Sequence, residues 1–320
     1  MTAPAARRPA YAPMRPAVAQ VLGEAADADP ALVVLGADGY GLATQVRDRH
    51  PRRYIDVGIA EANLVGVASG LARSGRPVVV GTMAPFLVRR AAEQIRNDVC
   101  NPGLNVTFLG VGGGVSYGTL GPTHHVPEDL GFFSGLPNTR VFCPTDVVDA
   151  AWAVREALAW PGPAYVRLGA REDRVVHPAD REFRADGLLL AEPGEALAVA
   201  TGVGVPVALD AAGLLAGHGV RLGVLALPVV KPFPAERVRE LATGLRAVAV
   251  VEEHLDSTGI TQHTARALVG RWQGAFLPHA VDDSYPPLGD RAELLDHFGI
   301  TAEAVAACLL ASLGRRSEAR

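Results

Sequence analysis

Short apolar runs alternate with segments of helical periodicity along the first half of the chain. The strands that this pattern predicts lie at residues 32–35, 77–80, 106–109 and 164–168. The helices that it predicts between them lie at residues 61–73, 85–99 and 146–160. Because strands and helices alternate, we expect a mainly parallel sheet with helices on both faces.

The same alternation begins again after a charged stretch, REDRVVHPADREFR, at residues 171–184. We expect further strands at residues 197–201, 220–227 and 247–252, and further helices at residues 205–216, 234–242, 260–270 and 302–313. The chain is therefore predicted to be an α/β protein of two consecutive three-layer α/β/α domains with mainly parallel sheets. We place a flexible arm at residues 1–13 and the domains at residues 14–184 and 185–320.

Composition narrows the class of protein. The chain has 320 residues, of which 49% are hydrophobic and 20% charged, so it can bury a large core. A net charge of −4 gives no basic excess, and we expect neither nucleic acid nor a membrane as a partner. Cys100, Cys143 and Cys308 are odd in number and widely spaced, which argues against a disulfide framework and favours a reducing, cytoplasmic location.

Candidate chemistry follows the predicted strands, because ligands of open parallel sheets bind at the carboxyl ends of the strands. Asp38 stands in the turn after the first strand, and Glu61 opens an otherwise apolar helix. A glycine-rich segment at residues 110–129 carries His124 and His125. From these residues alone, Glu61 could simply favour the helix dipole, and the glycine-rich segment could be a surface loop. We find no dinucleotide, phosphate-loop or serine-hydrolase motif.

Eight segments, taken in order, resemble one family. They are LGADG at 35–39, DVGIAEANLVGVASGLA at 56–72, TMAPFLVRRAAEQIR at 82–96, GVSYGTLGPTHHVPED at 114–129, LPNTRVFCPTD at 136–146, PGPAYVRLG at 161–169, VVEEH at 250–254 and GDRAELLDHFGITAEAV at 289–305. Together they resemble the C-terminal half of transketolase. The resemblance implies a pyrimidine-binding domain at residues 14–184 and a transketolase C-terminal domain, chiefly supporting the dimer, at residues 185–320.

The resemblance also implies a cofactor and a partner. Its cofactor is thiamine diphosphate with Mg²⁺ or Ca²⁺. The metal-binding GDG…N motif of the family is not found in this chain, so we expect no metal ligand here. An N-terminal, diphosphate-binding subunit is expected to supply those ligands. The expected assembly is α2β2, built on a homodimer of this chain.

Several residues match the coenzyme site of the family. Glu61 is expected to bond to N1′ of the pyrimidine and so to support the imino group that takes the C2 proton; its partial burial favours a shared proton. Phe86 matches the aromatic residue that packs on the aminopyrimidine, and Met83 stands where most relatives have a second aromatic residue. Asp38 and Arg89 complete the expected cofactor-binding set.

The expected substrate-binding residues depart more from the family. His124 matches a family histidine near the substrate carbonyl and hydroxyl groups, and it is expected to move protons. Leu120 replaces an aspartate that hydrogen-bonds to the hydroxyl groups of the donor, and a buried leucine cannot form those hydrogen bonds. Gly112 replaces a second histidine. Ala170 replaces a phosphate-binding arginine, for which the neighbouring Arg171 could substitute, and Arg15 matches the remaining one.

We therefore expect a subunit of a transketolase-like transferase that is active only with its partner. It would move a two-carbon ketol or acyl unit from a ketose or 2-oxo-acid donor to an aldehyde or ketone acceptor, and the donor would differ from the standard pentose phosphates. The sequence leaves open a subunit like the β chain of 2-oxo-acid dehydrogenases, one like 1-deoxyxylulose-5-phosphate synthase, and a non-catalytic scaffold. Glu61 argues against the scaffold.

Overall fold

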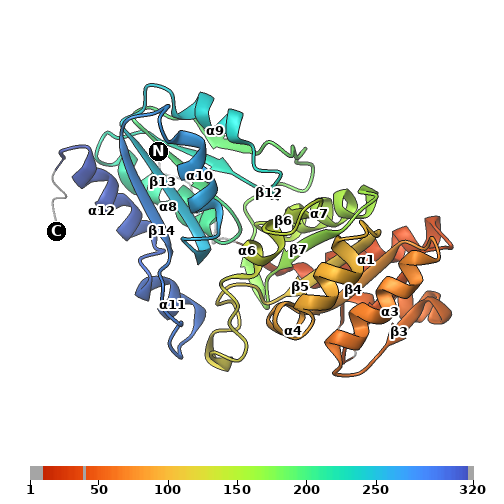
Figure 1. Ribbon diagram of the computed structural model, residues 1–320. Helices are drawn as coiled ribbons and strands as arrows, with labels where there is room; N and C mark the ends of the chain where they lie inside the picture. Colours follow the sequence, from red (N-terminus) through yellow and green to blue (C-terminus); the bar gives the residue numbers. More distant parts are fainter. Residues whose placement is uncertain (1–9, 39–40, 316–320) are drawn as a thin grey trace, which may run out of the picture.

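The computed structural model describes residues 10–38 and 41–315 (Figure 1). Two α/β units follow one another along the chain and lie side by side, the first coloured from red to green and the second from green to blue. The described residues form sheets of seven, five and two strands. The prediction of two α/β domains with mainly parallel sheets is confirmed.

The seven-stranded sheet belongs mainly to the first unit. Its strand order is β12-β6-β7-β5-β4-β2-β3, and every neighbouring pair except β12 and β6 is parallel. The strands are β2 (Val33–Gly36), β3 (Tyr54–Asp56), β4 (Val78–Met83), β5 (Val106–Val111), β6 (Arg140–Phe142), β7 (Ala164–Leu168) and β12 (Val229–Lys231).

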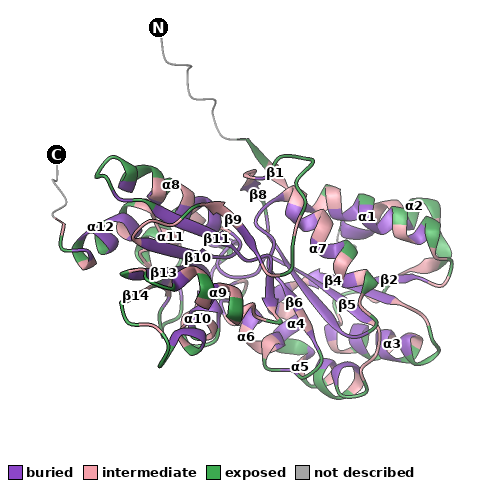
Figure 2. Ribbon diagram, turned by 90° about the horizontal axis from the view of Figure 1, so that it is seen from above, coloured by how far each residue is buried: buried purple, intermediate pink, exposed green. Residues whose placement is uncertain are grey.

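Helices cover both faces of this sheet. They are α1 (Met14–Ala28), α2 (Thr44–Arg49), α3 (Glu61–Arg73), α4 (Ala84–Arg90), α5 (Ala92–Gln94), α6 (Asp129–Ser134) and α7 (Val147–Ala159). Because side chains alternate along a strand, Leu35 of β2 joins a core with Leu64 of α3, whereas Val34 joins another with Leu22 of α1. Figure 2 shows these strands as a buried layer between helices with exposed outer faces.

The five-stranded sheet belongs to the second unit. Its order is β14-β13-β10-β11-β9, in which only the edge strand β9 is antiparallel to its neighbour. The strands are β9 (Leu188–Ala191), β10 (Ala196–Ala200), β11 (Leu222–Ala226), β13 (Ala247–Leu255) and β14 (Ala275–Val281). The helices are α8 (Gly204–Ala216), α9 (Ala235–Ala242), α10 (Ile260–Leu268), α11 (Arg291–His297) and α12 (Ala302–Ser312).

The two units are joined by more than a linker. Strand β12 comes from the second unit but pairs antiparallel with β6, at the edge of the first unit's sheet. One continuous hydrophobic cluster also contains Phe108 and Phe133 from the first unit together with Val250 and Ile260 from the second. A shared strand and a shared core therefore fix the position of the two units relative to each other.

Two local expectations were wrong. The helix expected at residues 85–99 is divided into α4, α5 and a π-helical segment (Ile95–Cys100), with Ala91 leaving helical geometry at φ −119° and ψ 15°. The last residues of the expected flexible arm instead form β1 (Tyr11–Pro13), which pairs with β8 (Glu172–Arg174). Residues 1–9 of that arm lie outside the described residues.

One stretch, residues 291–312, is long and apolar enough by composition to cross a membrane, with a mean hydropathy of 1.5. It comprises α11 and α12, and the buried Ile300 lies between these helices. Val305 and Leu309 of α12 pack into the core of the second unit. A core helix passes the same test of length and hydropathy.

Candidate active site

Glu61 is a buried carboxylate at the start of a helix. It is the first residue of α3 and is only 3% exposed. The helix forms here because Leu64, Val65 and Ala68 recur at helical spacing and pack into the core. The free N–H groups of a helix start favour a negative charge, but a buried carboxylate also needs a close partner.

That partner is Arg90. Its Nη1 donates to both carboxylate oxygens of Glu61, at 3.1 Å and 3.0 Å. The guanidinium carbon of Arg90 also lies 4.1 Å from the centroid of the Phe86 ring. Sequence reasoning missed Arg90, although the spacing of four residues between Phe86 and Arg90 on one helix predicts their contact. A flat cationic group thus stacks on Phe86 while it bonds to Glu61.

His124 contacts the same aromatic ring. It lies in the glycine-rich loop between β5 and α6, with its ring centroid 5.2 Å from that of Phe86 and 5.6 Å from that of Tyr117. Thr123 Oγ1 lies 2.9 Å from His124 Nδ1. Burial, followed by the charges of His125 and Arg90, lowers the pKa of His124. The imidazole is therefore neutral at pH 7 and can accept a proton.

The other residues expected at the coenzyme lie around this cluster. Met83 ends β4 and immediately precedes α4. Asp38 is exposed in the turn after β2, with φ at 63°. Strands β2, β4 and β5 are parallel neighbours, so both residues lie at the sheet edge from which the glycine-rich loop departs. Arg89 is 64% exposed and forms an ion pair with Glu128, so it lies on the rim rather than against Glu61.

Two of the expected substrate positions behave differently from one another. Gly112 is buried with φ at 79°, and the ring of Tyr117 packs against it. Leu120 ends a short 3-10 helix (Gly118–Leu120) and is 47% exposed. The expectation of a buried Leu120 was therefore wrong for this chain, because the 3-10 turn directs residue 120 outward.

A pocket of about 480 Å³ opens beside Phe86 and Arg90. Its walls include Thr123 from the glycine-rich loop and Tyr285 from the segment before α11. The tip of the loop lies close to that segment (Figure 1). A Cβ on Gly121 would lie 3.0 Å from the Leu288 side chain. The second unit therefore lines the mouth of the site, a contribution that the sequence did not indicate.

The expected anion-binding residues meet at the end of β7. Arg15, in α1, donates from Nη2 to the carbonyl oxygen of Ala170 at 3.2 Å. The structure thus brings together Arg15 and Ala170, two positions that the resemblance assigns to phosphate binding. Arg171 follows directly and is exposed.

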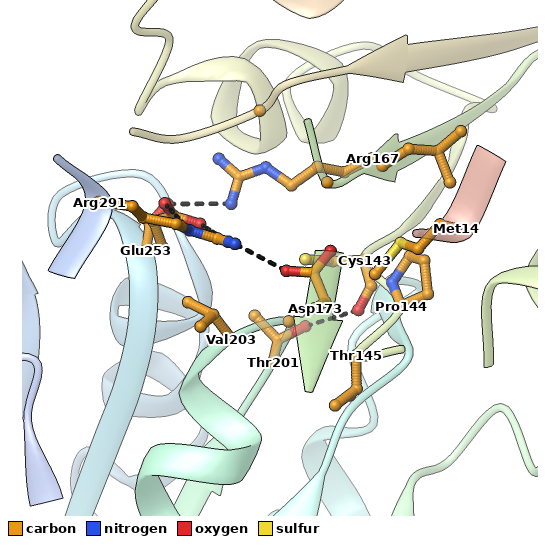
Figure 3. Close-up of a pocket in the computed structure, with 14 residues that line it drawn as sticks. Met14, Cys143, Pro144, Thr145, Arg167, Asp173, Thr201, Val203, Glu253 and Arg291 are labelled. Atoms are coloured by element: carbon orange, nitrogen blue, oxygen red, sulfur yellow. Dashed lines mark hydrogen bonds and ion pairs between the residues drawn. The ribbon is translucent and has the colours of Figure 1, made fainter. Parts of the chain in front are cut away.

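A buried ionic cluster lies where the two units meet (Figure 3). Arg167 bonds through Nε and Nη2 to Asp129, at 3.0 Å and 2.5 Å, and through Nη1 to the carbonyl oxygen of Glu253 at 2.9 Å. Arg291 bridges the carboxylates of Glu253 and Asp173, at 2.7 Å and 2.6 Å. Arg167, Asp173, Glu253 and Arg291 line a small cavity of about 20 Å³. None of them was assigned from the sequence, although Arg167 stands in the YVRLG segment.

This cluster also anchors the glycine-rich loop. The backbone N–H of Val115 donates to Glu253 Oε1 at 3.2 Å. Gly114 allows that approach, because its φ is 65° and a Cβ there would lie 2.7 Å from the Glu253 side chain. A carboxylate of the second unit therefore fixes the start of the loop that carries His124.

Comparisons with known families account for both units. Residues 11–173 match the transketolase pyrimidine binding domain, and residues 187–305 match the transketolase C-terminal domain. The chain belongs to the transketolase family. One similar protein is a subunit of the apulose-4-phosphate transketolase of Actinobacillus succinogenes, 34% identical over 80% of this chain and 83% of that one. Another is the SqwH subunit of the 6-deoxy-6-sulfo-D-fructose transketolase of a Clostridium species, 33% identical over 91% and 92%.

Solved transketolases share the fold. A structure described as "Split gene transketolase, inactive beta4 tetramer" superimposes with a TM-score of 0.84 at 31% identity, covering 95% of this chain and 99% of that one. Longer relatives match over about half their length: human transketolase is 30% identical over 48% of its own chain. The 1-deoxy-D-xylulose-5-phosphate synthase 2 of Geobacter sulfurreducens is 34% identical over 47% of its chain.

Transketolases depend on thiamine diphosphate, and the geometry around Glu61 fits the pyrimidine of that coenzyme. The Arg90 guanidinium demonstrates that a flat, nitrogen-bearing group can reach the Glu61 carboxylate while it stacks on Phe86. Glu61 and Phe86 are the residues of this chain that would hold the ring. Within residues 10–38 and 41–315, no group of three His, Cys, Asp or Glu side chains could hold a metal ion.

Proposed function

We propose that this chain is the second subunit of a two-component transketolase that requires thiamine diphosphate. The observation that carries the proposal is the buried Glu61 carboxylate beside Phe86, in a chain whose relatives of similar length are named as transketolase subunits. An N-terminal subunit supplies the diphosphate and metal ligands, with Mg²⁺ or Ca²⁺ as the ion. The assembly is α2β2 and contains a dimer of this chain.

In this proposal the bound coenzyme supplies the carbon that attacks the donor carbonyl. Glu61 holds a hydrogen bond at N1′ of the pyrimidine, and Phe86 fixes the plane of the ring. His124, a neutral imidazole within 5.2 Å of Phe86 by ring centroid, accepts and returns a proton at a donor hydroxyl. Met83 and Asp38 lie at the same sheet edge as the glycine-rich loop and complete the cofactor-binding set of this proposal.

We propose a donor other than the standard pentose phosphates. Gly112, Leu120 and Ala170 remove three polar side chains that relatives use for sugar phosphates, and Arg15 and Arg171 supply the remaining positive charge. Two relatives are named as subunits of transketolases of apulose 4-phosphate and of 6-deoxy-6-sulfo-D-fructose, and these names support a modified ketose as the donor. The two-carbon unit passes to an aldehyde acceptor.

The test is proton exchange at C2 of the coenzyme in the complex of this chain with its N-terminal subunit. We expect rapid exchange for the natural pair and a loss of roughly a hundredfold or more for Glu61→Gln, because the amide cannot share a proton with N1′. Exchange that is equally fast in Glu61→Gln contradicts the assignment of Glu61. Absence of exchange in the natural pair favours the non-catalytic scaffold.

Single-turnover assays then address the donor. Xylulose 5-phosphate and a set of deoxy- and sulfo-ketoses are compared on the same complex. We expect slow turnover of xylulose 5-phosphate and at least one faster modified ketose. Fast turnover of xylulose 5-phosphate contradicts the donor proposal but leaves the role of Glu61 intact.

A further inference from the structure

Both contacts that the proposed function gives to the pyrimidine are already made by one side chain. Arg90 Nη1 bonds to both oxygens of Glu61, and the Arg90 guanidinium stacks on the Phe86 ring. We infer that Arg90 is an internal latch: it takes the place of the coenzyme pyrimidine in the free subunit, and the coenzyme must displace it. This inference rests on the proposed function and adds a residue that controls coenzyme entry.

The charge balance explains why the latch closes. Glu61 is 3% exposed, and a buried carboxylate without a partner is strongly unfavourable. When no coenzyme is present, Arg90 is the cation that satisfies it. The site is therefore unstable when open, and it closes on its own arginine.

The exposure of Arg90 explains why the latch can open. The Arg90 side chain is 48% exposed, so its guanidinium can turn into water and be fully hydrated. Arg90 is the last residue of α4, directly before the break at Ala91, and its movement disturbs no helical turn beyond it. The pocket of about 480 Å³ beside Phe86 offers the space into which it can move.

Competition follows from the geometry at Glu61. Since the Arg90 guanidinium lies over Phe86 while Nη1 bonds to both oxygens of Glu61, the pyrimidine ring cannot occupy that same position in the latched state. The apparent affinity for the coenzyme is therefore the intrinsic affinity multiplied by the fraction of molecules in which the latch is open. Contacts from the partner subunit to the rest of the coenzyme supply the free energy that opens the latch, which ties coenzyme uptake to assembly.

The experiment measures binding of the pyrimidine half alone. The probe is 4-amino-5-hydroxymethyl-2-methylpyrimidine, titrated calorimetrically into the full chain. The variants are Arg90→Met, which keeps the aliphatic stem, and Arg73→Met, which removes one exposed arginine from the far end of α3. We expect Arg90→Met to bind the probe about tenfold more tightly than the natural chain, and Arg73→Met to match the natural chain.

The melting temperature provides a second measurement, which remains informative if Arg90→Met weakens the fold. Arg90→Met leaves Glu61 unpaired and is expected to melt at a lower temperature, whereas Glu61→Gln/Arg90→Met removes the buried charge and recovers stability. The probe is expected to raise the melting temperature of Arg90→Met more than that of the natural chain.

The outcomes separate the latch from the proposed function. Equal or weaker probe binding by Arg90→Met overturns the latch and leaves the coenzyme site intact. Failure of the natural chain and of Arg90→Met to bind the probe overturns the pyrimidine site itself.

Discussion

Gly112 makes room for the ring of Tyr117. A Cβ on Gly112 would lie 1.8 Å from Tyr117 Cε2, and the φ of Gly112 is 79°. The Tyr117 ring in turn stands edge-on to His124, with centroids 5.6 Å apart. The glycine at position 112 therefore allows an aromatic side chain to pack against His124.

Gly112→Ala is expected to push Tyr117 away from His124. The methyl group cannot fit beside the ring, and the positive φ strains alanine, so we expect a loss of about 1–3 kcal/mol in the free energy of unfolding. Denaturant unfolding and the turnover rate of the assembled enzyme measure the two effects.

Gly66→Ala is the matched control for that change. Nothing lies within 4 Å of a Cβ at Gly66, and this position is inside α3, so alanine is expected to stabilise the chain by about 0.5–1 kcal/mol. Normal stability and turnover in Gly112→Ala would mean that Tyr117 has another place to go.

Asp129→Asn is expected to damage the junction between the units. Asp129 is fully buried, accepts from Tyr165 at 2.6 Å and pairs with Arg167. Removing its charge leaves Arg167 buried without its partner, for which a loss of about 3–5 kcal/mol is typical. Denaturant unfolding of Asp129→Asn and of Asp129→Asn/Arg167→Met measures this, and the double variant should recover part of the loss. A change below about 1 kcal/mol in the single variant would contradict the strength that we assign to this pair.

Asp149→Asn is expected to change the pH dependence of stability. Burial is the main cause that raises the pKa of Asp149 from 3.8 to about 7. The folded chain keeps this proton when the unfolded chain has lost it, so the stabilisation is complete below about pH 4 and is lost as pH rises towards 7. Asparagine keeps the bond from the Thr145 N–H and has no proton to lose.

The measurement is urea unfolding of both chains at pH 5 and pH 8. The stability of Asp149→Asn relative to the natural chain should rise by roughly 1–3 kcal/mol between these pH values. Glu252, whose pKa burial also raises to about 7, keeps some of the same pH dependence in both chains. Parallel pH profiles would show that Asp149 is charged in the folded state at both pH values, as it is in the unfolded state, and would contradict the raised pKa.

Leu120→Asp is expected to shift donor preference. Leu120 is 47% exposed within the loop that carries His124, so a carboxylate there is hydrated and costs little stability. We expect kcat/KM for xylulose 5-phosphate to rise relative to that for the preferred modified ketose, because a carboxylate can accept bonds from donor hydroxyls. Competition assays with the two donors check this. A Leu120→Asn control separates charge from hydrogen bonding, and an unchanged ratio in both variants would place residue 120 outside donor recognition.

The sequence predicts well those elements whose residues satisfy a local rule. Helix α3 and strand β7 fall at the predicted residues, because α3 has regular apolar spacing and β7 is a short run that is apolar except for Arg167. Strand β14 was missed because Pro278 and His279 interrupt its apolar pattern. The break at Ala91 also has no local sign, since alanine is a good helix former.

The features that the sequence did not predict depend on contacts between residues far apart in the chain. Glu61 could be chosen from its motif, but its partner Arg90 is 29 residues away, and several other arginines could have served. Glu253 and Arg291 come from the second unit, so their approach to the glycine-rich loop depends on how the units pack. The outward turn of Leu120 likewise follows from a 3-10 turn that one glycine, Gly118, begins.

Strand β12 belongs to the second unit but pairs in the sheet of the first, and this limits where the chain can be divided into two separate proteins. A chain cut near residue 184 would leave β6 as an open edge, with its backbone groups free to recruit strands from other molecules. The released second fragment would carry an orphan strand and half of a hydrophobic cluster. Gene fission at that boundary is therefore disfavoured, and the two units should be inherited as one polypeptide.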